Sequence, residues 1–163
     1  MNDILRLLII VILLTISLAA YFLVIGTLFT TRVEKTQRVI NAMPGRAFGV
    51  GLVNVLFFGV IAVVLFSIAE SANGFLKGIL TIPALVIAGL LMILLSLGLT
   101  GMVNSFSTKL FADVVSWKRN LWGAVILCLA SALPFVGWFL LFPYLGFVGV
   151  GAVILSFFQR ELN

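Results

Sequence analysis

The chain has 163 residues, of which 63% are hydrophobic and 9% charged, and its ten Lys or Arg against five Asp or Glu give a net charge of +5 with no His. A soluble domain of this size would be about a quarter charged, so the composition excludes a water-soluble fold. Backbone groups in lipid must be hydrogen-bonded within a segment, and the apolar runs lack the alternation of barrel strands. We therefore expect an all-α, polytopic transmembrane helix bundle, formed as a single domain over residues 1–163.

Four apolar blocks are long enough to cross a bilayer, which takes about 20 residues per helix. In chain order they are Ile4–Phe29, Phe48–Ala69, Leu76–Val103 and Leu121–Phe158. The first block has the small residues of a signal peptide at 17–20, but its apolar run continues to Phe29 and then meets Arg32. We therefore expect an uncleaved membrane helix.

The fourth block is too long for one crossing. As a single helix it would be on the order of 57 Å long, whereas the apolar core of a bilayer is about 30 Å thick. Leu133-Pro134-Phe135-Val136-Gly137 supplies a break, because proline cannot continue the helical hydrogen bonds. This predicts two crossings, Leu121–Leu133 and Trp138–Phe158, and five segments in all. The alternatives are a break at Pro143 instead, and four crossings with a kinked or re-entrant last segment.

Most basic residues gather in two interruptions between the blocks. Residues 30–47 carry Arg32, Lys35, Arg38 and Arg46 against Glu34, and residues 104–120 carry Lys109, Lys118 and Arg119 against Asp113. Basic loops remain on the cytoplasmic side, and these two can share it because two crossings separate them. We therefore expect the N-terminus outside and the basic loops against anionic lipid, with no nucleic acid as a partner.

The second basic loop has an apolar repeat at helical spacing, made by Phe106, Leu110, Val114 and Trp117. The repeat predicts a short amphipathic helix in the interface, and the alternative is a solvated connector. A weaker repeat in the first basic loop ends at the turn signal Pro44-Gly45. We expect six residues to lie at the lipid interface: Arg32, Lys35, Arg38, Trp117, Lys118 and Arg119.

The chain is poor in residues that carry catalysis or hold cofactors. With no His and a single Cys, Cys128, it cannot form a haem, zinc or iron–sulfur site of the usual kind, nor a Ser/His or Cys/His nucleophile pair. Its carboxylates are all terminal or in loops, with no paired spacing: Asp3, Glu34, Glu70, Asp113 and Glu161. We expect no enzyme activity and no cofactor.

Small and mildly polar residues punctuate the apolar blocks. Asn54 is the most costly of them in lipid, and it either lines a pathway or bonds to a neighbouring helix. Glycines allow close approach of membrane helices. The candidate helix-packing or partner interface, within the chain or against another protein, is Asn54, Gly98, Gly101, Gly146, Gly149 and Gly151.

Three stretches resemble the membrane-helical segment that accompanies bactofilin-type, polymer-forming cytoskeletal domains. They are Pro44–Leu52 (PGRAFGVGL), Leu133–Trp138 (LPFVGW) and Gly146–Ala152 (GFVGVGA), followed by Phe158-Gln159-Arg160. The resemblance spans about Pro44 to Arg160, and the chain lacks the soluble β-domain of that family. It implies a multi-pass protein of anchoring type in the bacterial cytoplasmic (inner) membrane.

Two functions fit these observations. The first is a non-catalytic scaffold, anchor or accessory subunit of a larger membrane complex, bound to other membrane proteins or to further copies of itself. The alternative is a small oligomeric transporter or channel. Its polar route would be lined by Asn54, Ser96, Thr100 and Asn104.

Overall fold

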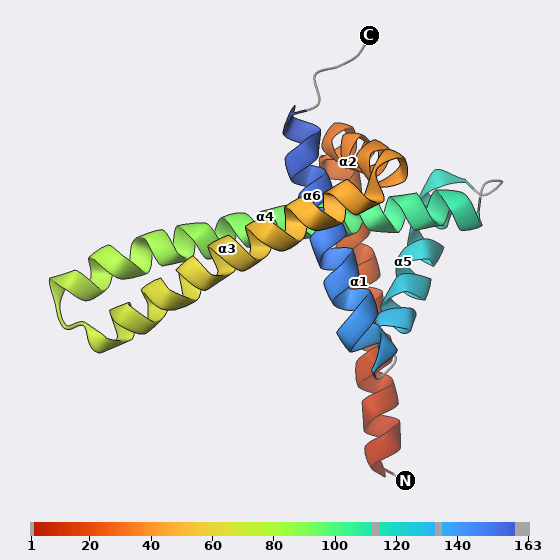
Figure 1. The fold of residues 1–163 in the computed structure, drawn as a ribbon. Helices are drawn as coiled ribbons and strands as arrows, with labels where there is room; N and C mark the ends of the chain where they lie inside the picture. Colours follow the sequence, from red (N-terminus) through yellow and green to blue (C-terminus); the bar gives the residue numbers. More distant parts are fainter. Residues whose placement is uncertain (1, 112–114, 133–134, 159–163) are drawn as a thin grey trace.

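A computed structural model shows the arrangement of the helices and describes residues 2–111, 115–132 and 135–158 (Figure 1). The described part is all-α, which confirms the predicted fold class. In order, the elements are α1 (Asn2–Leu28), α2 (Thr30–Ala42), α3 (Pro44–Ser71), α4 (Phe75–Leu110), α5 (Ser116–Ala132), the π-helical η1 (Val136–Leu141) and α6 (Phe142–Phe158). Four stretches of the described chain are long and apolar enough to cross a membrane: Leu8–Leu28, Pro44–Ser71, Phe75–Leu110 and Phe139–Phe158.

The helices form a body and a projecting arm (Figure 1). In the body, α5 packs against α1 and η1, and α2 packs against α4 and α6. Helices α3 and α4 pack along each other as a hairpin, and its distal part, residues 55–90, extends away from the body. We call this distal part the arm. Helix α6 packs against both α3 and α4 at the base of the hairpin and crosses them steeply.

The arm is held together by small buried residues and leaves its large apolar side chains exposed. Ala62, Ala69 and Ala84 are buried, whereas the outer side chains include Phe57 and Ile82, 61% and 65% exposed. The hairpin reverses at Gly74, whose φ of 62° lies in the left-handed region that favours glycine. An apolar hairpin without an outer cover matches a lipid environment, because water would penalise that surface.

The first basic loop contains a helix. In α2, Val33, Thr36, Val39 and Ile40 are buried, while the basic side chains of Arg32 and Arg38 are exposed. The weak apolar repeat of the sequence is therefore the buried face of a helix that lies on the body. Pro44 ends the connection by taking the first position of α3, where a missing N–H leaves no helical hydrogen bond unmade.

The prediction of a separate amphipathic helix at Phe106–Trp117 is wrong. Residues 106–110 continue α4, and Trp117 lies in the first turn of α5; Val114 is outside the described residues. No proline or glycine follows Gly101 in this stretch, so nothing in the sequence ends α4 earlier. Ser105 and Ser107 are buried in this last part of α4, which ties it to the body.

The fourth apolar block is divided near the predicted place. Helix α5 ends at Ala132 and helical structure resumes at Val136, with the two segments antiparallel (Figure 1); Leu133 and Pro134 lie outside the described residues. Pro143 does not end the helix. It lacks the N–H that would bond to the Phe139 carbonyl, and the turn before it is π-helical, with the Phe142 N–H bonded to the Gly137 carbonyl. The described residues therefore contain five apolar segments, and four of them have the length of a membrane span, because α5 has only 17 residues.

Candidate functional site

The glycines singled out in the sequence lie where α6 crosses the hairpin. A Cβ atom added to Gly149 would lie 2.7 Å from the carbonyl carbon of Gly98, so the backbones of α6 and α4 are in direct contact. On α3, Gly51 and Ala47 make the same kind of approach to Gly151. These glycines hold helices of this chain together at a crossing that larger residues would push apart.

The remaining predicted interface residues lie in different surroundings. A Cβ on Gly101 would lie 2.8 Å from Cγ2 of Thr36, which places α2 against α4. Gly146 is buried, and a Cβ there would lie 3.4 Å from Cδ1 of Leu95. The Asn54 side chain donates to the Val50 carbonyl at 2.8 Å, one turn back on α3. Asn54 therefore has a hydrogen bond within its own helix.

The polar residues of the transporter hypothesis also bond locally or in pairs. Thr100 donates to the Ser96 carbonyl at 2.8 Å, and the Ser96 hydroxyl is 2.6 Å from that of Tyr21 on α1. The backbone carbonyl of Asn104, not its side-chain amide, accepts from the Thr108 hydroxyl at 3.0 Å. These contacts tie α4 to itself and to α1.

The residues predicted at the lipid interface are mostly at the surface. Arg32 lies over the Phe157 ring at 4.4 Å and Lys118 over the Trp117 ring at 5.5 Å, both as cation–π contacts. Arg38 is exposed and Lys35 is half-buried. The Arg119 Nε is buried, and no described residue accepts a hydrogen bond from it.

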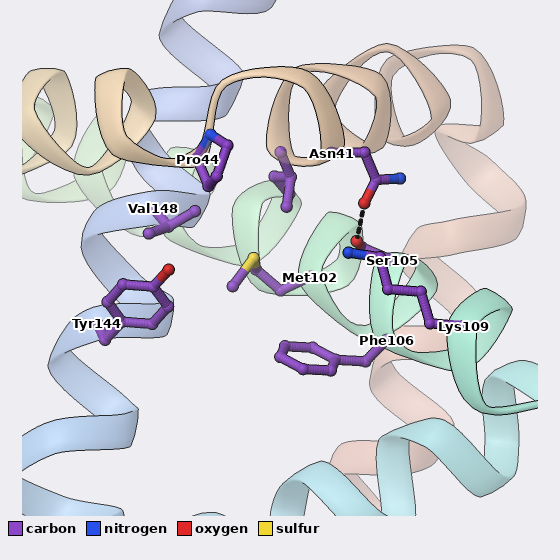
Figure 2. Close-up of a pocket in the computed structure, with 9 residues that line it drawn as sticks. Asn41, Pro44, Met102, Ser105, Phe106, Lys109, Tyr144 and Val148 are labelled. Carbon is purple, nitrogen blue, oxygen red and sulfur yellow. Dashed lines mark hydrogen bonds between the residues drawn. The ribbon is translucent and has the colours of Figure 1, made fainter.

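A cavity of about 200 Å³ lies between α2, α4 and α6, beside the start of α3 (Figure 2). Its polar lining consists of Asn41, Ser105, Lys109 and Tyr144. Its apolar lining consists of Ile40, Pro44, Met102, Phe106 and Val148. Figure 2 shows Lys109 reaching toward Asn41 and Ser105, with the Tyr144 hydroxyl directed inward from α6.

The cavity presents more donors than acceptors. Ser105 Oγ donates to Asn41 Oδ1 at 2.7 Å, which fixes the amide so that its NH₂ group keeps its donors. Neither the Lys109 ammonium nor the Tyr144 hydroxyl forms a hydrogen bond or ion pair with the part of the chain that the structure describes. None of the described residues that line the cavity is a carboxylate. The arrangement suits a ligand with several acceptor oxygens.

A second cavity, of about 340 Å³, lies between α1 and α4 and is mainly apolar. It is lined by Tyr21, Ile25, Phe29, Met92, Ile93, Ser96 and Leu97. Its two hydroxyls, of Tyr21 and Ser96, share one hydrogen bond. No group of three His, Cys, Asp or Glu that would hold a metal ion is found within the described residues.

Sequence reasoning placed Lys109 in a basic loop but missed the cavity. Neither Asn41 nor Tyr144 stands out in the sequence, because a single amide or phenol has no motif around it. The three elements that carry them meet only after α2 folds onto α4 and α6. The chain matches no protein-family model, no curated protein and no solved structure.

Proposed function

We propose that this chain is a non-catalytic integral membrane protein that acts as a scaffold, anchor or accessory subunit of a larger membrane complex. The arm is the observation that supports this proposal. Its large apolar side chains are exposed on both helices, and its four glycines, Gly59, Gly74, Gly78 and Gly89, have no atom within 4 Å of an added Cβ. Small residues on an exposed membrane helix allow a second helix to pack closely.

The proposed location is the bacterial cytoplasmic membrane, with the basic segments inside and anionic lipid around them. Two observations support it. Helix α2 packs against the last part of α4, where Gln37 donates to Thr108 at 3.1 Å, so the two basic segments lie together. The sequence resemblance to bactofilin-associated membrane segments points to the same membrane.

Native extraction in a mild detergent tests the proposal. The protein is expected to purify with other membrane chains or as a homo-oligomer, because a partner helix would cover the arm. Gly59→Leu places a bulky side chain in the open space beside the arm and should remove the partner while leaving the monomer folded. Val24→Leu on α1 is the control, since Val24 lies outside the arm, is already 54% exposed, and the change keeps a branched side chain.

Two results would contradict the proposal. One is a wild-type protein that purifies as a monomer with no partner from native membranes. The other is a partner that survives Gly59→Leu and the corresponding Gly89→Leu on α4, because then the arm is not the surface that binds it.

A further inference from the structure

Three donor groups that line the cavity between α2, α4 and α6 form no hydrogen bond with the described residues: the Lys109 ammonium, the Asn41 NH₂ group and the Tyr144 hydroxyl. They come from three different helices and line one space of about 200 Å³. A hydrogen bond from an ammonium is stronger than one between two neutral groups, and it is strongest when the acceptor carries a negative charge. No described residue of the lining is a carboxylate, so a negatively charged ligand can supply that acceptor.

The surroundings add positive potential. Helix α2 carries Arg32, Lys35 and Arg38 against Glu34 as its only carboxylate. Anions are therefore attracted to this end of the molecule before they enter the cavity.

The apolar wall narrows the class of anion. Met102, Phe106 and Val148 line the same space as the donors (Figure 2), so the ligand has an apolar portion next to its charge. Figure 2 shows Tyr144 on the opposite side of Met102 from Asn41 and Lys109. A phosphate-bearing head group offers acceptor oxygens on both its phosphate and its glycerol, so donors on separate sides of one cavity can meet different oxygens of the same ligand. We propose that this cavity binds the phosphate-bearing head group of an anionic lipid, held by Lys109, Asn41 and Tyr144 with its glycerol and first acyl carbons on the apolar wall.

Lipid binding at the cavity does not depend on a partner protein, so it can be tested on the purified chain. The full chain in uncharged detergent is titrated with phosphatidylglycerol, and bound lipid is counted by native mass spectrometry. Lys109→Gln should weaken the tightest-bound lipid by about ten-fold or more, because it removes a charged hydrogen-bond donor. Tyr144→Phe should weaken it by about two- to five-fold.

Lys77→Gln is the matched control. It makes the same change in net charge at the far end of the arm, where Lys77 is exposed, and should leave the tightest-bound lipid unchanged. Lys109, Asn41 and Tyr144 are all exposed on their helices, so the variants should keep wild-type helicity in circular dichroism. A second arm uses soluble glycerol phosphate, which separates recognition of a free phosphate ester from recognition of a lipid.

The outcomes are distinct. Loss of lipid binding with Lys109→Gln but not Lys77→Gln supports the site, and weak binding of glycerol phosphate shows that the acyl chain contributes. Glycerol phosphate that binds as tightly as the lipid would leave the phosphate site in place but overturn the role of the apolar wall. Equal losses of lipid binding with Lys109→Gln and Lys77→Gln would overturn the proposal, because lipid binding would then depend on the net charge of the protein and not on this cavity. No loss with either variant would also overturn it, because the Lys109 ammonium would then not contribute to lipid binding.

Discussion

At the scale of single residues, the contact between Gly149 and Gly98 sets how closely α6 approaches α4. Gly149→Ala adds a methyl group that would lie 2.7 Å from the Gly98 carbonyl carbon, and both partners are backbone that cannot rotate away. We expect the substitution to lower the free energy of unfolding by about 1–3 kcal/mol, the usual cost of forcing an extra carbon into a packed site. Unfolding by titration with SDS in mixed micelles, followed by circular dichroism, measures it.

Gly89→Ala is the control for this prediction. A Cβ at Gly89 meets no atom within 4 Å, and alanine favours a helix over glycine by up to about 1 kcal/mol. Gly89→Ala should therefore leave stability unchanged or slightly raised. If the two variants unfold alike, the crossing does not depend on direct backbone contact.

The sequence flags these glycines but does not pair them. Membrane helices use small residues for close approach in general, so Gly98, Gly149 and Gly151 are recognisable as packing residues. Which helix each one meets depends on the crossing of α6 over the hairpin, a long-range arrangement with no local signal. The donors of the cavity are harder to predict from the sequence than the glycines, because Asn41 and Tyr144 line a cavity only after folding brings other side chains next to them.

At the scale of elements, α2 is a polar segment that packs one face against the apolar body and leaves the other face exposed. Arg38 is exposed and the adjacent Val39 is 1% exposed, so neighbouring positions should differ sharply in reactivity. In a Cys128→Ala background, which removes the chain's one cysteine, Arg38→Cys should react rapidly with a maleimide in detergent. Val39→Cys should react at least about ten-fold more slowly, in line with a side chain that opens only rarely.

Equal labelling at the two positions would mean that α2 is a solvated connector and not a packed helix. Denaturation in SDS serves as the internal control, since both cysteines should then react at the same rate. If the Val39→Cys variant still reacts slowly with the maleimide in SDS, its slow labelling is caused by low reactivity of that thiol and not by burial in the folded protein.

Element boundaries were predictable where a residue imposes them on the backbone. The break after α5 follows from a block too long for the bilayer together with a proline. The start of α3 was predicted four residues late, because Pro44-Gly45 indicates a turn before a helix from Phe48, whereas Pro44 takes the first position of α3. The end of α4 was not predictable in this way. Its last part is polar and basic, which is typical of a loop, but Ser105 and Ser107 are buried against neighbouring helices and Ser105 bonds to Asn41. Tertiary contacts, which the sequence pattern does not contain, extend the helix.

At the scale of the whole molecule, the arm and the body run in steeply different directions (Figure 1). A flat bilayer therefore cannot have both the arm and the α1, α5 and α6 helices along its normal. Helix α3, with 28 residues, is about 42 Å long and exceeds the roughly 30 Å apolar core. The polar tip between Glu70 and Lys77 and the basic segments at the base lie at opposite ends of the arm, which is the charge distribution of a spanning hairpin.

Either the arm or the body spans the membrane, and the side of the membrane that the tip faces decides between these two orientations. With the arm as a spanning hairpin and the basic segments inside, Asn73 at the tip lies outside. In intact bacterial cells, with Cys128→Ala as background, Asn73→Cys should react with an impermeant maleimide, whereas Arg38→Cys should react only after the membrane is permeabilised. If both positions react from the same side, the arm lies along the membrane and the body spans it. Reaction of Arg38→Cys alone in intact cells would instead invert the orientation that the basic residues predict, because positive loops would then face outward.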